Sequence, residues 1–254
     1  MNLSVVIPVL DEAKCLGPFL EMLRERLGEG DQIIVVDGGS SDNSALIARE
    51  HADLVLHCDR GRARQMNLGA ERAEGDWLWF LHADCGRVVR GHIRALRALP
   101  EDAVWGRFDV RLSGNHRLFP LIGHAMNIRS RWTGIATGDQ GIFVRRDQFL
   151  EMGGFPMQPL MEDVALSQRL RRLAAPACLR PRLVADSRRW EEHGVWRTMM
   201  LMWQLRWRYW RGARAKTSSR VSGAVPRRGR VKTRLIPELG EDTALDVHQR
   251  LLDR

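Results

Sequence analysis

Residues 32–39 read QIIVVDGG, and this stretch decides the fold of the chain. The β-branched run before Asp37 predicts a buried parallel strand, because strands that are covered on both faces are apolar throughout. Asp37 stands where that strand ends, and the two glycines after it let the backbone approach a ligand closely. Its carboxylate either binds a base or ribose there or shapes the turn into the next helix, and both interpretations are open.

Short apolar runs repeat this pattern on both sides of the stretch. We expect the other strands at residues 3–8, 53–57 and 77–81, with helices at 18–27, 42–50 and 62–73. Strands that alternate with helices at this spacing predict an α/β fold, a doubly wound sheet with a mostly parallel core. Ligands collect at the carboxyl ends of such strands. The expected site is therefore formed by the loops that begin near Pro8, Asp37, His57 and His82.

The second half of the chain is less regular. We expect strands at 104–112 and 141–145, and helices near 116–131 and at 162–174. No internal repeat is visible.

The basic charge of the chain is confined to its last third. The 254 residues are 44% hydrophobic and 28% charged, a globular composition, with a formal net charge of +9. Residues 180–254 hold 18 Lys and Arg against 8 Asp and Glu, a net of +10. This distribution indicates a neutral domain with a basic appendage rather than a nucleic-acid-binding domain, so no nucleic-acid partner is expected.

The four cysteines form no CxxC pair and no tight cluster, which argues against a zinc site or a disulfide framework. The chain starts directly in a strand-like segment, and no window reaches the roughly 18 apolar residues of a spanning helix. We therefore expect a cytoplasmic protein whose contact with a membrane, if any, comes from its surface.

Three further groups of residues follow expected strands or begin expected helices. Gly61 and the arginines at 62 and 64 open a helix, where they either bind a phosphate or form a solvated face. Asp84 follows a hydrophobic strand, a position suited to a divalent cation that bridges a diphosphate, with His82 as a ligand, a hydrogen-bond partner or a structural residue. Glu162-Asp163 begins a helix, so the pair either stabilises the helix through a favourable interaction with its dipole or supplies a general base. Asp42 is interpreted more simply, as a cap of the second helix.

In this order, these motifs resemble the family 2 glycosyltransferases of the GT-A fold over roughly residues 3–212. Residues 4–12, SVVIPVLDE, look like the opening strand and nucleotide loop of that family, and residues 35–42, VVDGGSSD, look like its second signature. His82-Ala83-Asp84 stands at the place of the DxD element, and Glu162-Asp163 matches the ED element. Gly38 stands where many members have a second Asp, and His82 replaces the first Asp of DxD.

The resemblance implies a role for each matching residue. Asp163 is the expected catalytic base, and Asp84 is the expected ligand of a Mg²⁺ or Mn²⁺ cofactor. The nucleotide-sugar donor is expected to contact Pro8, Leu10, Glu12, Asp37, Gly61, Arg62, Arg64, Gln65, His82, Asp84, Arg189 and Trp190. Residues 187–190, SRRW, resemble an arginine-tryptophan element that closes over the diphosphate in some members. The acceptor side is expected to include Gly138, Asp139, Gln140, Gly154 and Glu162.

Two narrower resemblances concern the subgroup and the C-terminus. Residues 61–67, the His-Ala-Asp form and residues 138–141 look like a bacterial subgroup associated with arsenosugar biosynthesis, whose members also resemble carotenoid-acid glycosyltransferases. Residues 221–254 resemble the phosphate loop that opens a nucleotidyltransferase-like domain, of which this is a truncated stub or simply a basic tail.

The expected organisation follows from these resemblances. A GT-A domain covers residues 1–212, with a nucleotide-binding part at about 1–100 and an acceptor part at about 101–190. A basic, Trp-rich amphipathic helix at about 193–212 completes the domain, and a basic tail covers 213–254.

Within that helix, residues 195–211 place four tryptophans and two methionines, Met199 and Met200, at helical spacing on one face. Such a stripe with basic flanks suits a membrane interface or a partner groove, or else it packs on the catalytic domain.

The sequence thus predicts an inverting, metal-assisted transfer of a sugar from a nucleoside-diphosphate sugar to an acceptor hydroxyl. The acceptor is unidentified, either a small metabolite or a lipid-like molecule. Two alternatives stay open, a sugar nucleotidyltransferase and a basic membrane- or partner-binding protein without catalysis.

Overall fold

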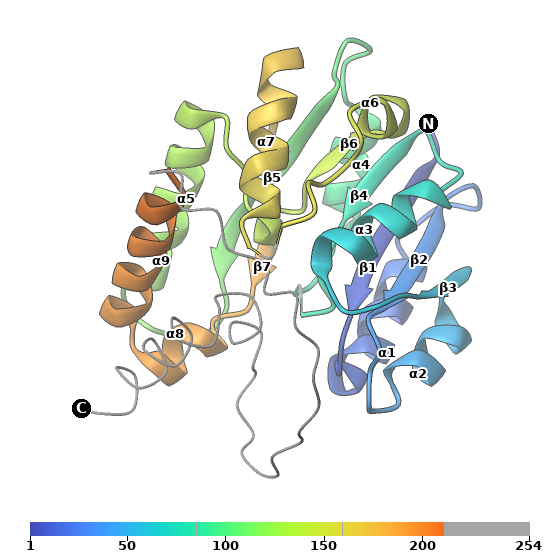
Figure 1. Cartoon of the computed structure of the whole chain (residues 1–254), viewed down its shortest axis with the longest axis horizontal. Helices are drawn as coiled ribbons and strands as arrows, with labels where there is room; N and C mark the ends of the chain where they lie inside the picture. Colours follow the sequence, from blue (N-terminus) through green and yellow to red (C-terminus); the bar gives the residue numbers. More distant parts are fainter. Residues whose placement is uncertain (85, 159, 211–254) are drawn as a thin grey trace.

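The computed structural model describes residues 1–84, 86–158 and 160–210. One seven-stranded sheet runs through these residues in the order β3-β2-β1-β4-β6-β5-β7. The strands are β1 (Leu3–Val9), β2 (Gln32–Asp37), β3 (Leu54–His57), β4 (Trp77–Phe80), β5 (Trp105–Leu112), β6 (Phe143–Arg145) and β7 (Ala177–Ala185). Strands β1 to β4 are parallel to one another, β6 is antiparallel to both of its neighbours, and β7 is parallel to β5. The predicted α/β fold with a mostly parallel sheet is confirmed (Figure 1).

Helices cover both faces of the sheet. On one face lie α1 (Ala13–Arg24), α2 (Ser44–His51) and α4 (Arg90–Arg97), packed against alternate side chains of β1 and β2 such as Val5 and Ile33. On the other face lie α3 (Arg62–Glu71), α6 (Arg146–Glu151) and α7 (Glu162–Leu173), packed against Val6 and Ile34. Successive side chains of β1 and β2 point to opposite faces of the sheet, and helices cover both faces. Most positions of these two strands are therefore apolar.

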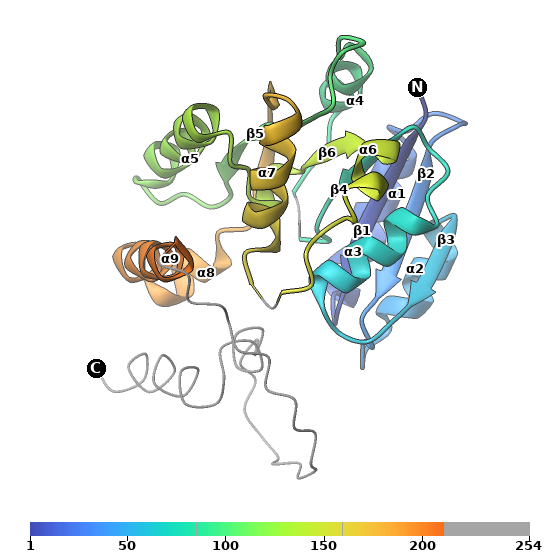
Figure 2. The ribbon, with the colours of Figure 1, turned by 45° about the horizontal axis from the view of Figure 1, so that its top comes forward.

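A third apolar cluster lies beyond the short strand β6. It joins the outer parts of β5 and β7 to α5 (Phe119–Thr133), α8 (Arg188–His193) and α9 (Val195–Trp210). These helices form the end of the molecule away from β3 (Figures 1 and 2). Among the described residues, no helix combines the length and the apolar character needed to cross a membrane.

The prediction of a helix from residue 18 is wrong, because α1 begins five residues earlier and contains Pro18. Distant side chains hold its first turn. Asp42 accepts a hydrogen bond from the Ala13 amide, and the Ser44 hydroxyl accepts one from the Glu12 amide. These bonds satisfy amide groups that a helix start leaves unpaired, and they offset the one backbone bond that proline cannot donate.

The remaining predicted elements are present, with ends that differ by at most three residues. Helices α4, α6 and α8 and strand β7 were not predicted. Strand β7 pairs only with β5, and its register shifts around Pro181, where two residues have no partner between Leu179 and Arg182. Proline is tolerated at such an irregularity because it has no amide hydrogen to donate.

Candidate active site

Asp37, at the end of β2, is 3% exposed and accepts hydrogen bonds from its own loop. The Gly39 amide donates at 3.1 Å, the Ser40 amide at 3.2 Å, and the Ser40 hydroxyl donates as well. His57 Nδ1, from the end of β3, lies 3.4 Å from the same carboxylate. Gly39 has a φ of +87°, which favours glycine. The carboxylate therefore shapes the loop that follows β2, and its predicted contact with a base or ribose stays a prediction.

The loop after β1 is tied to the loop after β2. Asp11, at a φ of +54°, accepts hydrogen bonds from the Ser41 amide at 2.7 Å and from the Ser41 hydroxyl. Asp42 accepts from the Ala13 and Ser44 amides, so it holds the first residues of both α1 and α2. Burial opposes ionisation, but these hydrogen bonds lower the pKa of Asp42. The two loops thus form one preorganised rim at the ends of β1 and β2.

The side chain of Gln65 in α3 joins the ends of β1 and β2 next to this rim. Its side-chain amide is buried and donates to the Val9 carbonyl at 2.9 Å and to the Val36 carbonyl at 2.8 Å. A Cβ at Gly38 would lie 3.0 Å from the Gln65 side chain. The predicted contact of Gln65 with the donor stays a prediction, and in this structure the residue joins β1 to β2.

Arg62, in the first turn of α3, is surrounded by carboxylates. Burial alone would lower its pKa, but the charges of Glu162, Asp163, Asp139 and Asp84 raise it. The nearest charge is Glu162, whose Oε1 lies 3.3 Å from Nε of Arg62 without the alignment of a hydrogen bond. One permanent cation therefore lies within electrostatic range of acidic side chains from three separate loops.

His82 contacts the same guanidinium. Nη2 of Arg62 lies 2.5 Å from Nε2 of His82. Because a guanidinium only donates, Nε2 accepts and the ring carries its hydrogen on Nδ1. This arrangement gives His82 the role of a hydrogen-bond partner, and its Nε2 is not free to bind a metal ion while the contact lasts.

Asp163 lies in the first turn of α7 and is half-buried. Its Oδ2 accepts a hydrogen bond from the Gly138 amide at 2.7 Å, and its Oδ1 accepts one from the Val164 amide. A Cβ at Gly138 would lie 2.6 Å from Nε2 of His82 and 2.7 Å from Nη2 of Arg62, so a larger residue there would displace these two side chains. The chain therefore brings the predicted base, the His82 loop and the 138–140 turn to one point.

Glu162, beside Asp163, is 3% exposed. Burial is the largest influence on it and raises its pKa, the charge of Asp163 raises it further, and the charge of Arg62 opposes both. Burial therefore disfavours the ionised form of the Glu162 carboxyl group, whereas the neighbouring guanidinium of Arg62 favours it.

Asp84 follows β4 and takes part in no hydrogen bond or ion pair with the other described residues. Arg188 is exposed and its guanidinium donates a hydrogen bond to Asp186, which is the largest influence that raises its pKa. Burial opposes this, and the charges of Asp84 and Glu12 raise the pKa further. Burial, followed by the charge of Glu12, raises the pKa of the nearby Cys15 thiol to about 11. That thiol therefore stays protonated at neutral pH and is not a nucleophile.

A divalent cation fits the Asp84 side of the site better than the His82 side. Mg²⁺ and Mn²⁺ prefer oxygen ligands, and one carboxylate together with substrate phosphates is a common arrangement for Mg²⁺. Asp84 offers such a carboxylate, whereas His82 is engaged by Arg62. Among the described residues there is no group of three His, Cys, Asp or Glu side chains able to hold a metal ion by themselves.

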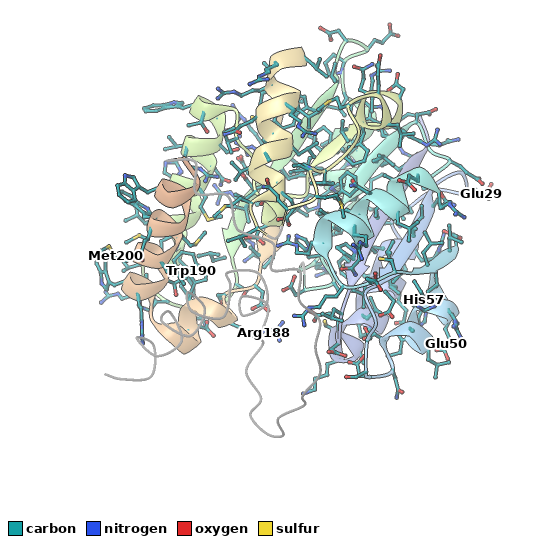
Figure 3. The ribbon with its side chains drawn as sticks, in the orientation of Figure 1. Glu29, Glu50, His57, Arg188, Trp190 and Met200 are labelled. Atoms are coloured by element: carbon teal, nitrogen blue, oxygen red, sulfur yellow. The ribbon has the colours of Figure 1, made fainter. Side chains whose placement is uncertain are left out.

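Several predicted donor contacts lie apart from this carboxylate cluster. Arg64 forms an exposed ion pair with Asp59 at 2.6 Å. Trp190 is buried in the third apolar cluster, beneath α9 (Figure 3). The side chain of Arg189 and the segment 213–254 lie outside the described residues.

The predicted acceptor-side residues surround the cluster more closely. Asp139 is exposed and acts on Arg62 by its charge. Gln140 is buried and its Oε1 accepts from the Thr137 amide at 3.2 Å. Gly154, at a φ of +67°, lies against Asn67 of α3, whose side chain pairs with the backbone of Phe155. Residues 137–155 therefore form the second wall of the site.

A profile described as "Glycosyl transferase family 2" matches residues 4–153, more than half of the chain. The chain belongs to glycosyl transferase family 2. The profile extends from β1 to the residues just after α6 and ends before Gly154 and α7. The family assignment and the GT-A fold, predicted from the sequence, are confirmed, while the arsenosugar-associated subgroup and the second, truncated domain stay predictions.

Curated relatives carry transferase names. A "PGL/p-HBAD biosynthesis glycosyltransferase" of Mycobacterium bovis is 29% identical over 167 residues, which cover 61% of this chain and 63% of the relative. An "undecaprenyl-phosphate 4-deoxy-4-formamido-L-arabinose transferase" of Pseudomonas aeruginosa is 28% identical over 166 residues, 56% of this chain and 45% of the relative. The chain therefore spans less than two thirds of the length of these relatives.

Solved structures of sugar-transferring enzymes share the fold. The mannosyltransferase PcManGT of Pyrobaculum calidifontis, in complex with GDP-Man and Mn²⁺, aligns with a TM-score of 0.58 at 19% identity, over 72% of this chain and 56% of that one. Glucosyl-3-phosphoglycerate synthase of Mycobacterium tuberculosis, in complex with Mn²⁺, UDP and its product, aligns with a TM-score of 0.54 at 17% identity, over 72% and 70%. At these identities the likeness establishes the fold alone.

Sequence reasoning missed two residues of the site. Arg188 is influenced by the charges of Asp84 and Glu12. Asn67 fixes the Gly154 turn. The SRRW run signals an arginine at this place, but the prediction assigned the contact to Arg189 and not to Arg188.

Proposed function

We propose that this protein is an inverting glycosyltransferase that moves a sugar from a nucleoside-diphosphate sugar to an acceptor hydroxyl. The observation that carries the proposal is the meeting of Asp163, Gly138, Arg62 and His82 beside Asp84, at the edge where parallel strands end. A leaving diphosphate needs cationic and metal contacts, and an attacking hydroxyl needs a base, and both kinds of group are present within this one edge.

The rim formed by the loops after β1 and β2 would hold the nucleoside of the donor. Its carboxylates are already oriented by Ser40, Ser41 and the Gly39 amide, so little ordering remains for binding. The diphosphate would lie toward Asp84, between the guanidinium groups of Arg62 and Arg188. Mg²⁺ or Mn²⁺ bound at Asp84 would neutralise charge on the leaving group.

Asp163 would act as the base. As the acceptor oxygen attacks the anomeric carbon, its proton passes to the Asp163 carboxylate. The bond from that carbon to the diphosphate oxygen breaks on the opposite side, and its electron pair leaves with the nucleoside diphosphate. One displacement of this kind inverts the anomeric centre. The Gly138 amide holds Asp163 in place for this step.

The acceptor is proposed only as a class. The names of relatives include one that acts on undecaprenyl phosphate, which favours a lipid-like acceptor over a small soluble metabolite. The sequence also predicts peripheral membrane contact through residues 195–211. That membrane contact stays a proposal. The exposed apolar surface includes residues of α5 as well as residues of the 195–211 segment.

A binding and product assay on the full chain tests the proposed function. Thermal shift with a panel of nucleoside diphosphates and nucleotide sugars, with Mn²⁺ or with EDTA, should give an increase in Tm for one base, because a ligand that binds the folded state stabilises it. Turnover of that donor should release a nucleoside diphosphate. Release of pyrophosphate instead would support a sugar nucleotidyltransferase, and the absence of any nucleotide-dependent shift would support a binding protein without catalysis.

A further inference from the structure

Helix α9 buries its less apolar face and exposes its aromatic one. Val195 and Thr198 are buried, and Met199 and Met202 pack against the third apolar cluster. The exposed fractions on the other face are 69% for Trp196, 71% for Met200, 72% for Trp203 and 54% for Trp207. The prediction that Met199 shares a stripe with the tryptophans is therefore wrong, because Met199 faces the domain. Packing on the catalytic domain accounts for Met199 and Met202 but leaves Met200 and these three tryptophans in solvent.

Helix α5 repeats this arrangement. It buries Phe119, Gly123 and Asn127. It exposes Trp132 at 87%, Leu121 at 64% and Ile128 at 37%. Positions 121, 128 and 132 have the same spacing as positions 196, 203 and 207, so each helix presents one continuous apolar stripe to solvent.

The two helices are neighbours. Phe119, Ile122 and Met126 of α5 share one apolar cluster with Met199 and Met202 of α9. Both helices lie at the same end of the molecule in two views, and Met200 points away from the domain there (Figures 1, 2 and 3). Soluble monomers rarely expose contiguous apolar surface of this kind without a partner. We refer to the exposed residues of both helices, Leu121, Ile128, Trp132, Trp196, Met200, Trp203 and Trp207, as the α5–α9 surface.

The two helices that carry the α5–α9 surface contain basic residues and no acidic ones. Helix α5 (Phe119–Thr133) holds 2 arginines and no Asp or Glu. Helix α9 (Val195–Trp210) holds 3 arginines and no Asp or Glu. Both segments thus combine exposed aromatic side chains with unbalanced positive charge, the combination that favours the surface of an anionic bilayer.

We propose that the α5–α9 surface binds the headgroup region of an anionic lipid bilayer, with the tryptophans of both helices entering the interface. Tryptophan is the residue most enriched at that depth, and arginine beside it contacts lipid phosphate. A second copy of the chain is the less favourable occupant, because a symmetric dimer across this surface would bring the two basic segments together. This inference goes beyond the proposed function and does not depend on it.

Vesicle flotation with the full chain tests this binding. Vesicles of phosphatidylcholine mixed with phosphatidylglycerol should carry the protein, pure phosphatidylcholine should carry much less, and about 0.5 M NaCl should reduce the bound fraction because salt screens the charges. The double variant Trp132→Ser/Trp203→Ser should bind anionic vesicles about tenfold more weakly, since two exposed aromatic side chains no longer enter the interface. Each single variant should show part of the loss.

Leu46→Ser on α2 is the matched control, since Leu46 is 57% exposed but lies elsewhere on the fold. It should bind vesicles as the unchanged protein does. Full binding by the double variant, or equal binding to neutral and anionic vesicles, would overturn the proposal. So would a concentration-dependent dimer in sedimentation that the double variant loses. The nucleotide-induced Tm shift should be unchanged in every variant, which separates a failure of this proposal from a failure of the proposed function.

Discussion

Two groups of carboxylates stand at the same edge of the sheet, and they differ in what they contact. Asp11, Asp37 and Asp42, in the loops after β1 and β2, accept hydrogen bonds from serines and backbone amides of those loops. Asp84, after β4, accepts no hydrogen bond from another described residue. Glu162, at the start of α7, is buried, and Arg62 is the cation nearest to it. The first group is satisfied without a ligand and gives the loops their shape. The second keeps charge available for a ligand, and Asp163, held by two backbone amides, lies between these extremes.

The largest effect should follow from removing the proposed base. Asp163→Asn keeps an oxygen that can accept from the Gly138 amide but cannot take a proton. We expect the transfer rate to fall by about 10²–10⁴-fold, the usual contribution of a general base, measured as kcat with the donor found by thermal shift. The Tm should stay close to that of the unchanged protein. A variant with normal transfer would remove Asp163 from the mechanism and leave it as a helix-start residue.

Asp37→Ala and Asp84→Ala compare the two groups of carboxylates directly. Loss of the Asp37 side chain leaves the Gly39 and Ser40 amides without their acceptor, so we expect the free energy of unfolding in urea to fall by about 2 kcal/mol. Asp84→Ala should change it by less, about 0.5 kcal/mol, because Asp84 accepts no hydrogen bond from another described residue. Asp84→Ala should instead abolish the Mn²⁺-dependent part of the nucleotide-induced Tm shift. Equal losses of stability in both variants would contradict the comparison.

Asp42→Ala should cost about 1 kcal/mol of unfolding free energy at neutral pH, because two helix starts lose an acceptor. Hydrogen bonding lowers the pKa of Asp42 in the folded state from 3.8, despite the opposing effect of burial. Its contribution is therefore present above pH 3.8 and lost as the pH falls below that value. Parallel urea titrations of both proteins at several pH values should converge at acid pH.

The smallest effect concerns Glu162, and its sign is opposite. Burial raises the pKa of Glu162 above 4.5, so its contribution to stability is largest below pH 4.5 and declines as the pH rises through the folded-state value. Glu162→Gln does not ionise. We expect the Tm advantage of the unchanged protein over Glu162→Gln to shrink from acid to neutral pH, measured by calorimetry. A constant difference would mean that Glu162 does not change its charge in this range.

The sequence predicted the donor half of the fold more completely than the second half. Strands β1 and β2 are apolar and β-branched, and the residues that end them are turn formers, so pattern and position agree. Strand β7 reads ACLRPRLVA, with two arginines and a proline, and only its pairing with β5 makes it a strand. Its existence depends on contacts that no local pattern encodes.

The site shows the same division. Asp37, Asp84 and Asp163 could be named because each follows a strand or begins a helix. The contact of Asp163 with Gly138, 25 residues away, and the contact of Arg62 with His82 depend on tertiary structure. For α1, the helix start was misplaced because the side chains that hold its first turn come from the loop before α2. Long-range hydrogen bonds of this kind are not visible in helix propensity.

Because β6 runs in the opposite direction to β4 and β5, the two halves of the site can be altered independently. Each donor loop follows a parallel strand, whereas the 138–140 turn precedes β6, which runs back between β4 and β5. The chain therefore enters the sheet from the functional edge at this one place. Residues 138–140 could therefore be exchanged for those of another family member while β1 to β4 and their loops stay unchanged. If the predicted acceptor role of this turn holds, such an exchange would change the acceptor and leave the donor loops as they are.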